Sequence, residues 1–198
     1  MTFAAWGPGG PPIELGEGMG MKIAPKQDIV LQIHYFRSSP NVEGISDQSG
    51  IALRTLESVD RQVIQSMIGP WDFVIPAGDE AYTYQDAYPF RAPAELEIIG
   101  VFPHMHVLGA AYDSWIQHKN GEKECLVRSD AYSFHNQETY MFKEPVSFKG
   151  GDTFFTSCTW NNSPSNPDII YNPPVDVYPG EGTDNEMCLF ITYFAEAG

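Results

Sequence analysis

The segment AELEIIGVFPHMHVL, residues 94 to 108, joins a long apolar run to two histidines that stand two positions apart. In a β-strand successive side chains point to opposite faces, so residues i and i+2 lie side by side on one face. His104 and His106 would therefore point the same way, and burying two imidazoles without partners is costly. The pair could bind one metal ion, but a metal usually takes three or four ligands, so the others must come from elsewhere in the chain.

The rest of the chain is also typical of strands. Short apolar runs bounded by Gly, Pro, Asn and Asp recur from end to end, and helical spacing is scarce. Such runs without intervening helices predict an all-β fold, an antiparallel β-sandwich of jelly-roll type. We expect strands at 28–36, 49–58, 71–76, 94–108, 112–118, 152–160 and 186–196. Only the segment 57–67 would also fit a short helix.

Composition and charge exclude several classes of partner. The chain has 198 residues, of which 42% are hydrophobic, so it is long and apolar enough to bury a core. Its formal net charge is −15 and it holds only 11 Lys and Arg residues, which argues against nucleic acid and against an anionic membrane surface. In addition, no apolar run approaches the length of a membrane helix. We therefore expect no nucleic-acid or membrane partner.

Two further residues are candidate metal ligands, although each taken alone is more typical of a structural role. His34, in DIVLQIHYF, faces away from the more apolar side of its expected strand. Met187 lies in EMCLFITYF, where strand alternation places it on the face opposite to Cys188. A thioether ligand beside two imidazoles would favour copper, especially Cu(I), over zinc. Periodicity alone, however, does not bring Met187 to the histidine pair.

Other polar residues have less specific surroundings. His118 and His135 stand next to turn-like polar residues, and we expect them at surface or supporting positions. Asp184 and Glu186 fall in a charged loop and are expected to be solvated rather than catalytic.

Three segments in order carry a resemblance to a known family: HMHVLG (104–109), GDTFFTSCTWNN (151–162) and GEGTDNEMCLFITYF (180–194). Together they resemble the second domain of the copper type II, ascorbate-dependent monooxygenases. This family includes peptidylglycine α-hydroxylating monooxygenase and dopamine β-hydroxylase, and the second is the more similar. LQIHYFRSSPNVEGISDQSGIAL (31–53) resembles a strand and loop near the end of the family's first domain.

The resemblance implies a copper site and an activity. The family's oxygen-binding copper falls on His104, His106 and Met187, which would make these three both the metal ligands and the catalytic residues. The implied reaction is hydroxylation of a substrate C–H bond with O₂ and an external reductant such as ascorbate. The substrate would be a small organic molecule or a peptide.

The same resemblance implies a second, incomplete site and a division into domains. His34 matches one of three histidines that hold the family's electron-supplying copper, and no histidine precedes it in the sequence. We therefore expect residues 1–66 to be the C-terminal part of the first jelly-roll domain with a linker, and residues 67–198 to be the second, copper-binding domain. The N-terminal part of the first copper domain would be missing, through excision or natural shortening.

The family's disulfide next to the methionine ligand falls on Cys158 and Cys188. A further pair expected in animal members is absent, and Cys125 has no obvious partner. A disulfide implies an oxidising compartment, so we expect an extracytoplasmic protein, periplasmic or secreted.

Two functions remain open at this point. One is a copper-dependent monooxygenase present as a partial chain, favoured by the retention of all three ligands at the oxygen-binding site. The alternative is a non-catalytic copper-binding or interaction module on the same β-sandwich, favoured by the loss of two ligands at the other site. A copper titration combined with a test for O₂ consumption separates them.

Overall fold

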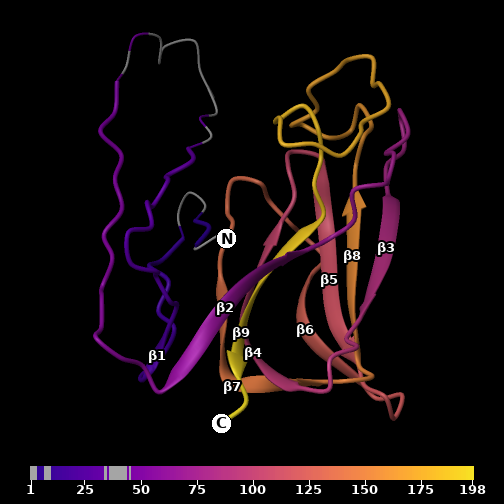
Figure 1. Ribbon diagram of the computed structural model, residues 1–198. Helices are drawn as coiled ribbons and strands as arrows, with labels where there is room; N and C mark the ends of the chain where they lie inside the picture. Colours follow the sequence, from indigo (N-terminus) through magenta and orange to yellow (C-terminus); the bar gives the residue numbers. More distant parts are fainter. Residues whose placement is uncertain (1–3, 7–9, 34, 36–43, 45) are drawn as a thin grey trace.

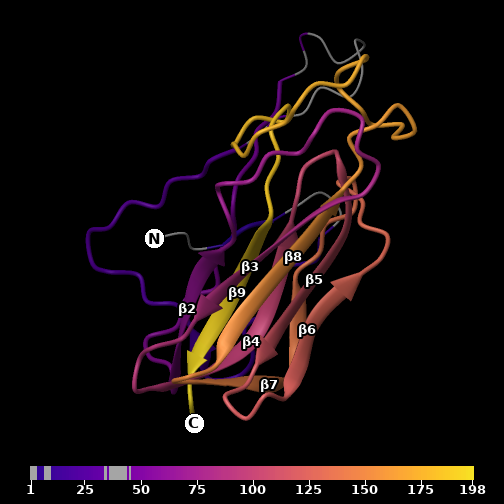
Figure 2. The ribbon, with the colours of Figure 1, turned by 90° about the vertical axis from the view of Figure 1, so that its right-hand side faces the viewer.

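The structure is a computed structural model that describes residues 4–6, 10–33, 35, 44 and 46–198. Two β-sheets face each other in a sandwich (Figures 1 and 2). One sheet has, in spatial order, β1 (Met19–Gly20), β2 (Arg61–Ile68), β9 (Leu189–Glu196), β4 (Glu95–His104) and β7 (Tyr140–Lys149). The other has β3 (Tyr82–Pro89), β8 (Thr153–Trp160), β5 (Gly109–Gln117) and β6 (Lys123–Ser129).

These sheets confirm the prediction of an all-β sandwich. Every strand pair is antiparallel except the short parallel pair of β1 with β2. The jelly-roll type of connection stays a prediction. None of the described residues belongs to a helix with the length and apolar character needed to cross a bilayer.

The core lies between the sheets and follows the two-residue period of the strands. In β8, Phe154, Thr156, Cys158 and Trp160 are buried, and the residues that alternate with them are partly exposed. β9 is instead buried on both faces: Phe190 contributes to the core between the sheets, and Ile191 to a second apolar cluster on the outer face. Five apolar residues of the N-terminal segment pack on that outer cluster: Ala5, Ile13, Leu15, Met19 and Met21.

Several expected elements are wrong or incomplete. The segment that could have been a helix, 57–67, forms β2 from Arg61 onward, because Val63 and Gln65 alternate with exposed neighbours and the strand pairs with β9. The described residues of 28–36 and all of 49–58 belong to no strand, and their apolar side chains are exposed. Apolar alternation gives a strand only where a neighbouring strand accepts its backbone hydrogen bonds.

Other differences concern which segments form strands and where the strands end. The segment 71–76 contributes only an isolated bridge, between Ile75 and Val177. β3, β6 and β7 were not expected, although the alternating tyrosines of YTYQDAYP in β3 match its alternating exposure. β4 ends at His104, so His106 lies beyond the strand.

Gly69 follows β2 at a point where the chain leaves no room for a side chain. A Cβ there would clash with the carbonyl oxygen of Cys188 and lie 2.8 Å from Cδ2 of Leu189. We expect Gly69→Ala to lower the free energy of unfolding by about 2–3 kcal/mol, because backbone must shift to admit the methyl group. Chemical denaturation measures this, with Gly50→Ala as the control, since nothing lies within 4 Å of a Cβ there. Equal losses in both variants would contradict the close packing at Gly69.

His118, just beyond β5, joins two carboxylates at the end of the sandwich opposite to His104 and His106. Its Nδ1 lies 3.1 Å from Oδ2 of Asp152, and its Nε2 lies 2.9 Å from Oε2 of Glu124. The buried Asp152 also accepts hydrogen bonds from the backbone N–H groups of Lys119 and Lys149. His118 is thus a partly buried residue that connects these two carboxylates.

These contacts predict a pH dependence. The hydrogen bond to Glu124 raises the pKa of His118, burial opposes the rise, and Asp152 adds to it. The unfolded pKa of a histidine is about 6.5, and the folded pKa of His118 lies above it. The protonated ring therefore stabilises the folded state fully below about pH 6.5, and this stabilisation is lost as the pH rises through the folded pKa. Denaturation curves should therefore show a larger stability difference between wild type and His118→Gln at about pH 6 than at about pH 8. A difference that does not change with pH would contradict the ion pairing of His118.

Candidate metal centre

His104 and His106 lie next to each other where β4 ends. Their ring centroids are 5.1 Å apart, and the ring planes cross at 78°. Phe102, which belongs to the outer apolar cluster, stacks on His104 at 6.1 Å, so the histidines follow the outer face of the five-stranded sheet. His106 is 5% exposed, and His104 is half-buried. The two rings are neighbours, as the spacing predicted, although only His104 belongs to the strand.

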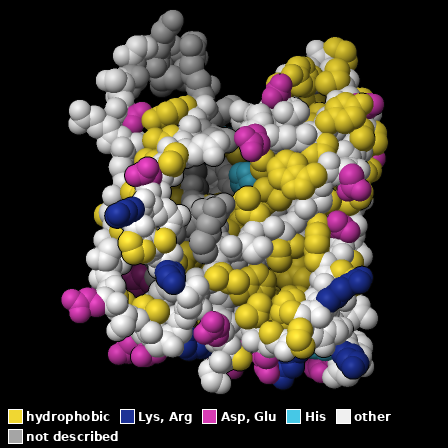
Figure 3. Space-filling model, in the orientation of Figure 1, with side chains coloured by type: hydrophobic (Ala, Val, Ile, Leu, Met, Phe, Trp, Pro, Cys, Tyr) yellow, Lys and Arg dark blue, Asp and Glu magenta, His cyan; other side chains and the backbone are white. Residues whose placement is uncertain are grey.

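Figure 3 shows a histidine side chain (cyan) beside hydrophobic side chains on this face of the molecule. Acidic side chains are scattered around this surface.

Both imidazoles are held through Nδ1 by oxygen acceptors. Nδ1 of His104 is 2.7 Å from Oε1 of Gln137, and Nδ1 of His106 is 3.0 Å from the carbonyl oxygen of Asn185. The Gln137 amide group is itself oriented, because its Nε2 donates to the carbonyl oxygen of Phe134 at 2.9 Å. Each neutral ring therefore carries its proton on Nδ1 and its lone pair on Nε2. This is the tautomer that a metal bound at Nε2 requires.

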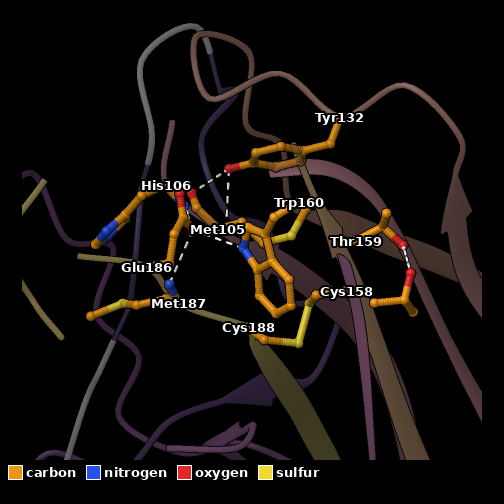
Figure 4. Close-up of a disulfide and its surroundings, with 10 residues drawn as sticks. Met105, His106, Tyr132, Cys158, Thr159, Trp160, Glu186, Met187 and Cys188 are labelled. Carbon is orange, nitrogen blue, oxygen red and sulfur yellow. Dashed lines mark hydrogen bonds between the residues drawn. A yellow bond between two sulfur atoms is a disulfide. The ribbon is translucent and has the colours of Figure 1, made fainter. Parts of the chain in front are cut away.

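Met187 precedes β9, the strand that pairs with β4, whose last residue is His104. The register of β4 with β9 ends at His104 opposite Leu189. His106 and Met187 both lie beyond the paired strands, and continuing the same register by two residues would set them opposite each other. Figure 4 shows the imidazole of His106 and the thioether of Met187 extending in the same direction, away from Trp160 and the disulfide.

Glu186 lies between these ligand candidates, and its expected solvation is wrong: the side chain is fully buried. Oε2 accepts hydrogen bonds from the backbone N–H of His106 at 2.9 Å, from that of Met187 at 3.2 Å and from Nε1 of Trp160 at 2.9 Å. Oε1 accepts the N–H of Leu108 at 2.7 Å. One carboxyl group thus joins the histidine segment to the methionine segment.

The surroundings of Glu186 act on its pKa in opposite directions. The pKa is raised to about 7, because burial raises it by more than the hydrogen bonds from His106, Leu108, Met187 and Trp160 lower it. Asp184, by contrast, is exposed as expected, and it accepts a hydrogen bond from the hydroxyl of Tyr171 at 3.1 Å. Alternation along a strand gave no signal that would separate these two acidic residues, since both precede β9.

The disulfide between Cys158 and Cys188 that the resemblance implied is present and connects the two sheets. Its Cα atoms are 5.8 Å apart, and both cysteines are buried in the core. Cys188 and Met187 face opposite sides, so the cross-link and the candidate ligand do not compete for space.

Cys125 is exposed and free, which gives a direct prediction about thiols. Thiol titration of denatured, unreduced protein should find one reactive group per chain, because the other two cysteines are cross-linked. After reduction it should find three. Three reactive groups before reduction would contradict the disulfide.

The predictions for the other two histidines, His34 and His135, have different outcomes. His34 lies outside the described residues. His135 is at the surface, with its side chain 58% exposed and Nε2 3.7 Å from Oδ1 of Asp168. In the described part of the chain, no group of three or more His, Cys, Asp and Glu residues could hold a metal ion. The candidate centre is of another kind, since its third donor would be a thioether.

Residues 63–197 match the family described as copper type II ascorbate-dependent monooxygenase, C-terminal domain. This match covers more than half of the chain, and the chain therefore belongs to that family, as its sequence motifs predicted.

Individual relatives are more distant. The chain is 27% identical to dopamine beta-hydroxylase of Equus caballus over 212 residues, which cover 98% of this chain and 33% of that protein. It is 26% identical to peptidyl-glycine alpha-amidating monooxygenase A of Xenopus laevis, over 98% of this chain and 20% of the relative. For dopamine beta-hydroxylase of Homo sapiens the identity is 25%, over 98% and 32%. The chain thus spans a third or less of the length of these relatives.

Proposed function

We propose that this chain supplies the oxygen-binding copper centre of a copper-dependent monooxygenase, with His104, His106 and Met187 as the ligands. The observation that carries the proposal is the paired imidazoles, each tied through Nδ1 to an oxygen acceptor. Family membership supports the same assignment, as does the β4–β9 register, which would set Met187 opposite His106 if it continued for two residues beyond the paired strands.

The donor set fits copper. Two neutral imidazoles suit either oxidation state, and the soft thioether of Met187 favours Cu(I). When bound, copper would supply the redox chemistry with O₂ that leads to hydroxylation of a substrate C–H bond. The protein would hold the ligands in position. Gln137 and Asn185 keep the protons of the two imidazoles on Nδ1, and Glu186 fixes the backbone at His106 and at Met187.

The reaction must balance in electrons. Insertion of one oxygen atom into a C–H bond consumes O₂, two protons and two electrons, and yields the alcohol and water. One copper centre supplies one electron, so the other comes from a second centre or from a reductant such as ascorbate. His34 would be one ligand of that second centre. A small organic molecule or a peptide would be the substrate.

The division into domains belongs to the same proposal. Residues 1–66 would be the end of a first copper domain with a linker, and residues 67–198 would be the second domain. The boundary falls inside β2, so this strand would join the linker to the second domain's sheet. The N-terminal part of the first domain would be the partner that completes the second copper centre. The exposed apolar side chains at Ile29, Leu31, Ile33 and Tyr35 support such a partner.

The disulfide supports a location outside the cytosol. Cross-links of this kind persist in oxidising compartments, and both cysteines are deep in the core. We therefore place the protein in the periplasm or outside the cell.

Anaerobic titration with Cu(I), followed by oxygen-electrode measurements with ascorbate, tests the proposal. Wild type should bind one copper at this site and consume O₂ slowly, with hydrogen peroxide as the main product, because the second electron is poorly delivered. His135→Ala should behave as wild type. Copper binding without O₂ consumption would favour the non-catalytic module instead, and absence of copper binding would overturn the proposal.

A further inference from the structure

The connection between β6 and β7, residues 130–139, contacts the segment that carries both histidines. Three of its side chains contact three consecutive residues of that segment. Gln137 contacts His104, Tyr132 contacts Met105, and Phe134 contacts His106. The first is a hydrogen bond to the imidazole, the second a pair of hydrogen bonds to the backbone, and the third an edge-on ring contact at 6.1 Å.

The contact made by Tyr132 is the most constraining of the three. Its hydroxyl donates to the carbonyl oxygen of Met105 at 2.6 Å and accepts the N–H of Met105 at 3.2 Å (Figure 4). Met105 is 1% exposed and lies beyond His104, the last residue of β4 paired with β9. A buried backbone group without a strand partner needs another one, and a single hydroxyl serves both groups here.

Tyr132 is itself held firmly. Its backbone N–H donates to the carbonyl oxygen of Ala110 at 2.8 Å, and its ring meets that of Tyr112 edge-on at 5.9 Å. The ring also fills the space beside Gly109, where a Cβ would lie 2.7 Å from Cδ1 of Tyr132 and 2.9 Å from Cβ of Met105. The hydroxyl therefore has a fixed place from which to hold Met105.

We propose that Tyr132 is a positioning residue for the candidate copper centre: its hydroxyl fixes the peptide groups of Met105 and thereby the directions of the flanking His104 and His106 side chains. The copper part of this inference rests on the proposed function. The conformational part does not, because the orientation of the two imidazoles can be measured without metal.

Tyr132→Phe tests the inference, because it removes the hydroxyl and keeps the ring against Gly109. Tyr84→Phe is the matched control: it removes a hydroxyl that donates to Oδ1 of Asp72 at 3.0 Å, from a tyrosine that also packs on the main core. Both variants are compared with wild type under conditions where all three are fully folded. The readouts are Cu(I) affinity by competition with a chelator, and ¹⁵N and ¹³C NMR of the histidine rings in metal-free protein.

We expect Tyr132→Phe to bind Cu(I) about 10–100-fold more weakly than wild type, the range typical of losing a supporting partner of a metal ligand. In metal-free protein it should shift and broaden the signals of His104 and His106. Tyr84→Phe should leave both readouts unchanged. Wild-type affinity together with wild-type ring signals in Tyr132→Phe would overturn the inference.

The two proposals fail in different ways. If wild type binds no Cu(I), the proposed function fails, and the ring signals of the metal-free variants still decide the role of Tyr132. If wild type binds Cu(I) and Tyr132→Phe binds it equally well with unchanged ring signals, only the positioning role fails.

Discussion

Glu186→Ala is expected to lower the free energy of unfolding by about 4–6 kcal/mol, because it leaves four buried donors without their acceptor and opens a cavity. Each unsatisfied buried group costs about 1–3 kcal/mol, and partial relaxation keeps the sum below the maximum. This loss is comparable with the whole stability of a marginal domain, about 5–15 kcal/mol.

Glu186→Gln should remain folded and show an intermediate loss of about 1–3 kcal/mol, because its amide keeps one acceptor oxygen and turns an NH₂ group toward a donor. Asp184→Ala is the control, since Asp184 is exposed and its removal should change stability by less than about 0.5 kcal/mol. Guanidinium denaturation at pH 7 measures all three variants. A loss below about 1 kcal/mol in Glu186→Ala would show that the carboxyl group does not join the two segments.

His106→Ala is expected to weaken copper binding by more than the factor of about 10–100 seen when only a supporting partner is lost. The variant removes one of three proposed donors, and two remaining ligands hold copper poorly against water and chelators. His135→Ala serves as the control, because that side chain is 58% exposed and lies away from the paired histidines. Competition titrations with a chromogenic Cu(I) chelator give both affinities, and circular dichroism checks the fold. Equal affinities in the two variants would remove His106 from the site.

Local sequence periodicity predicted the parts of the site that depend on one strand. The spacing of His104 and His106 predicted that their rings are neighbours, and two-residue alternation separated Met187 from Cys188, although these two residues precede β9. Runs bounded by turn residues likewise predicted two-layered β-structure. These features depend only on residues a few positions apart in the sequence, and the two-residue period of a strand determines which face each side chain occupies.

Contacts between distant segments could not be predicted in the same way. The backbones of His106 and Met187 are joined through the carboxyl group of Glu186, and Glu186 is buried because four donors from three segments meet there. The apolar alternation in 28–36 and 49–58 predicted strands, but alternation does not supply a pairing partner. Resemblance to a family indicated Met187 as a ligand candidate, whereas neither periodicity nor resemblance indicated Tyr132.

X-ray absorption spectroscopy of the protein loaded anaerobically with Cu(I) tests the central claim most directly. We expect wild type to show one sulfur scatterer together with two imidazole nitrogens, and Met187→Ile to lose the sulfur and keep the nitrogens. Met187→Ile should also weaken Cu(I) binding more than Cu(II) binding, because the thioether is the soft donor of the set. A wild-type spectrum without sulfur, or full copper retention in His104→Ala, would contradict the assignment of His104, His106 and Met187 as one copper centre.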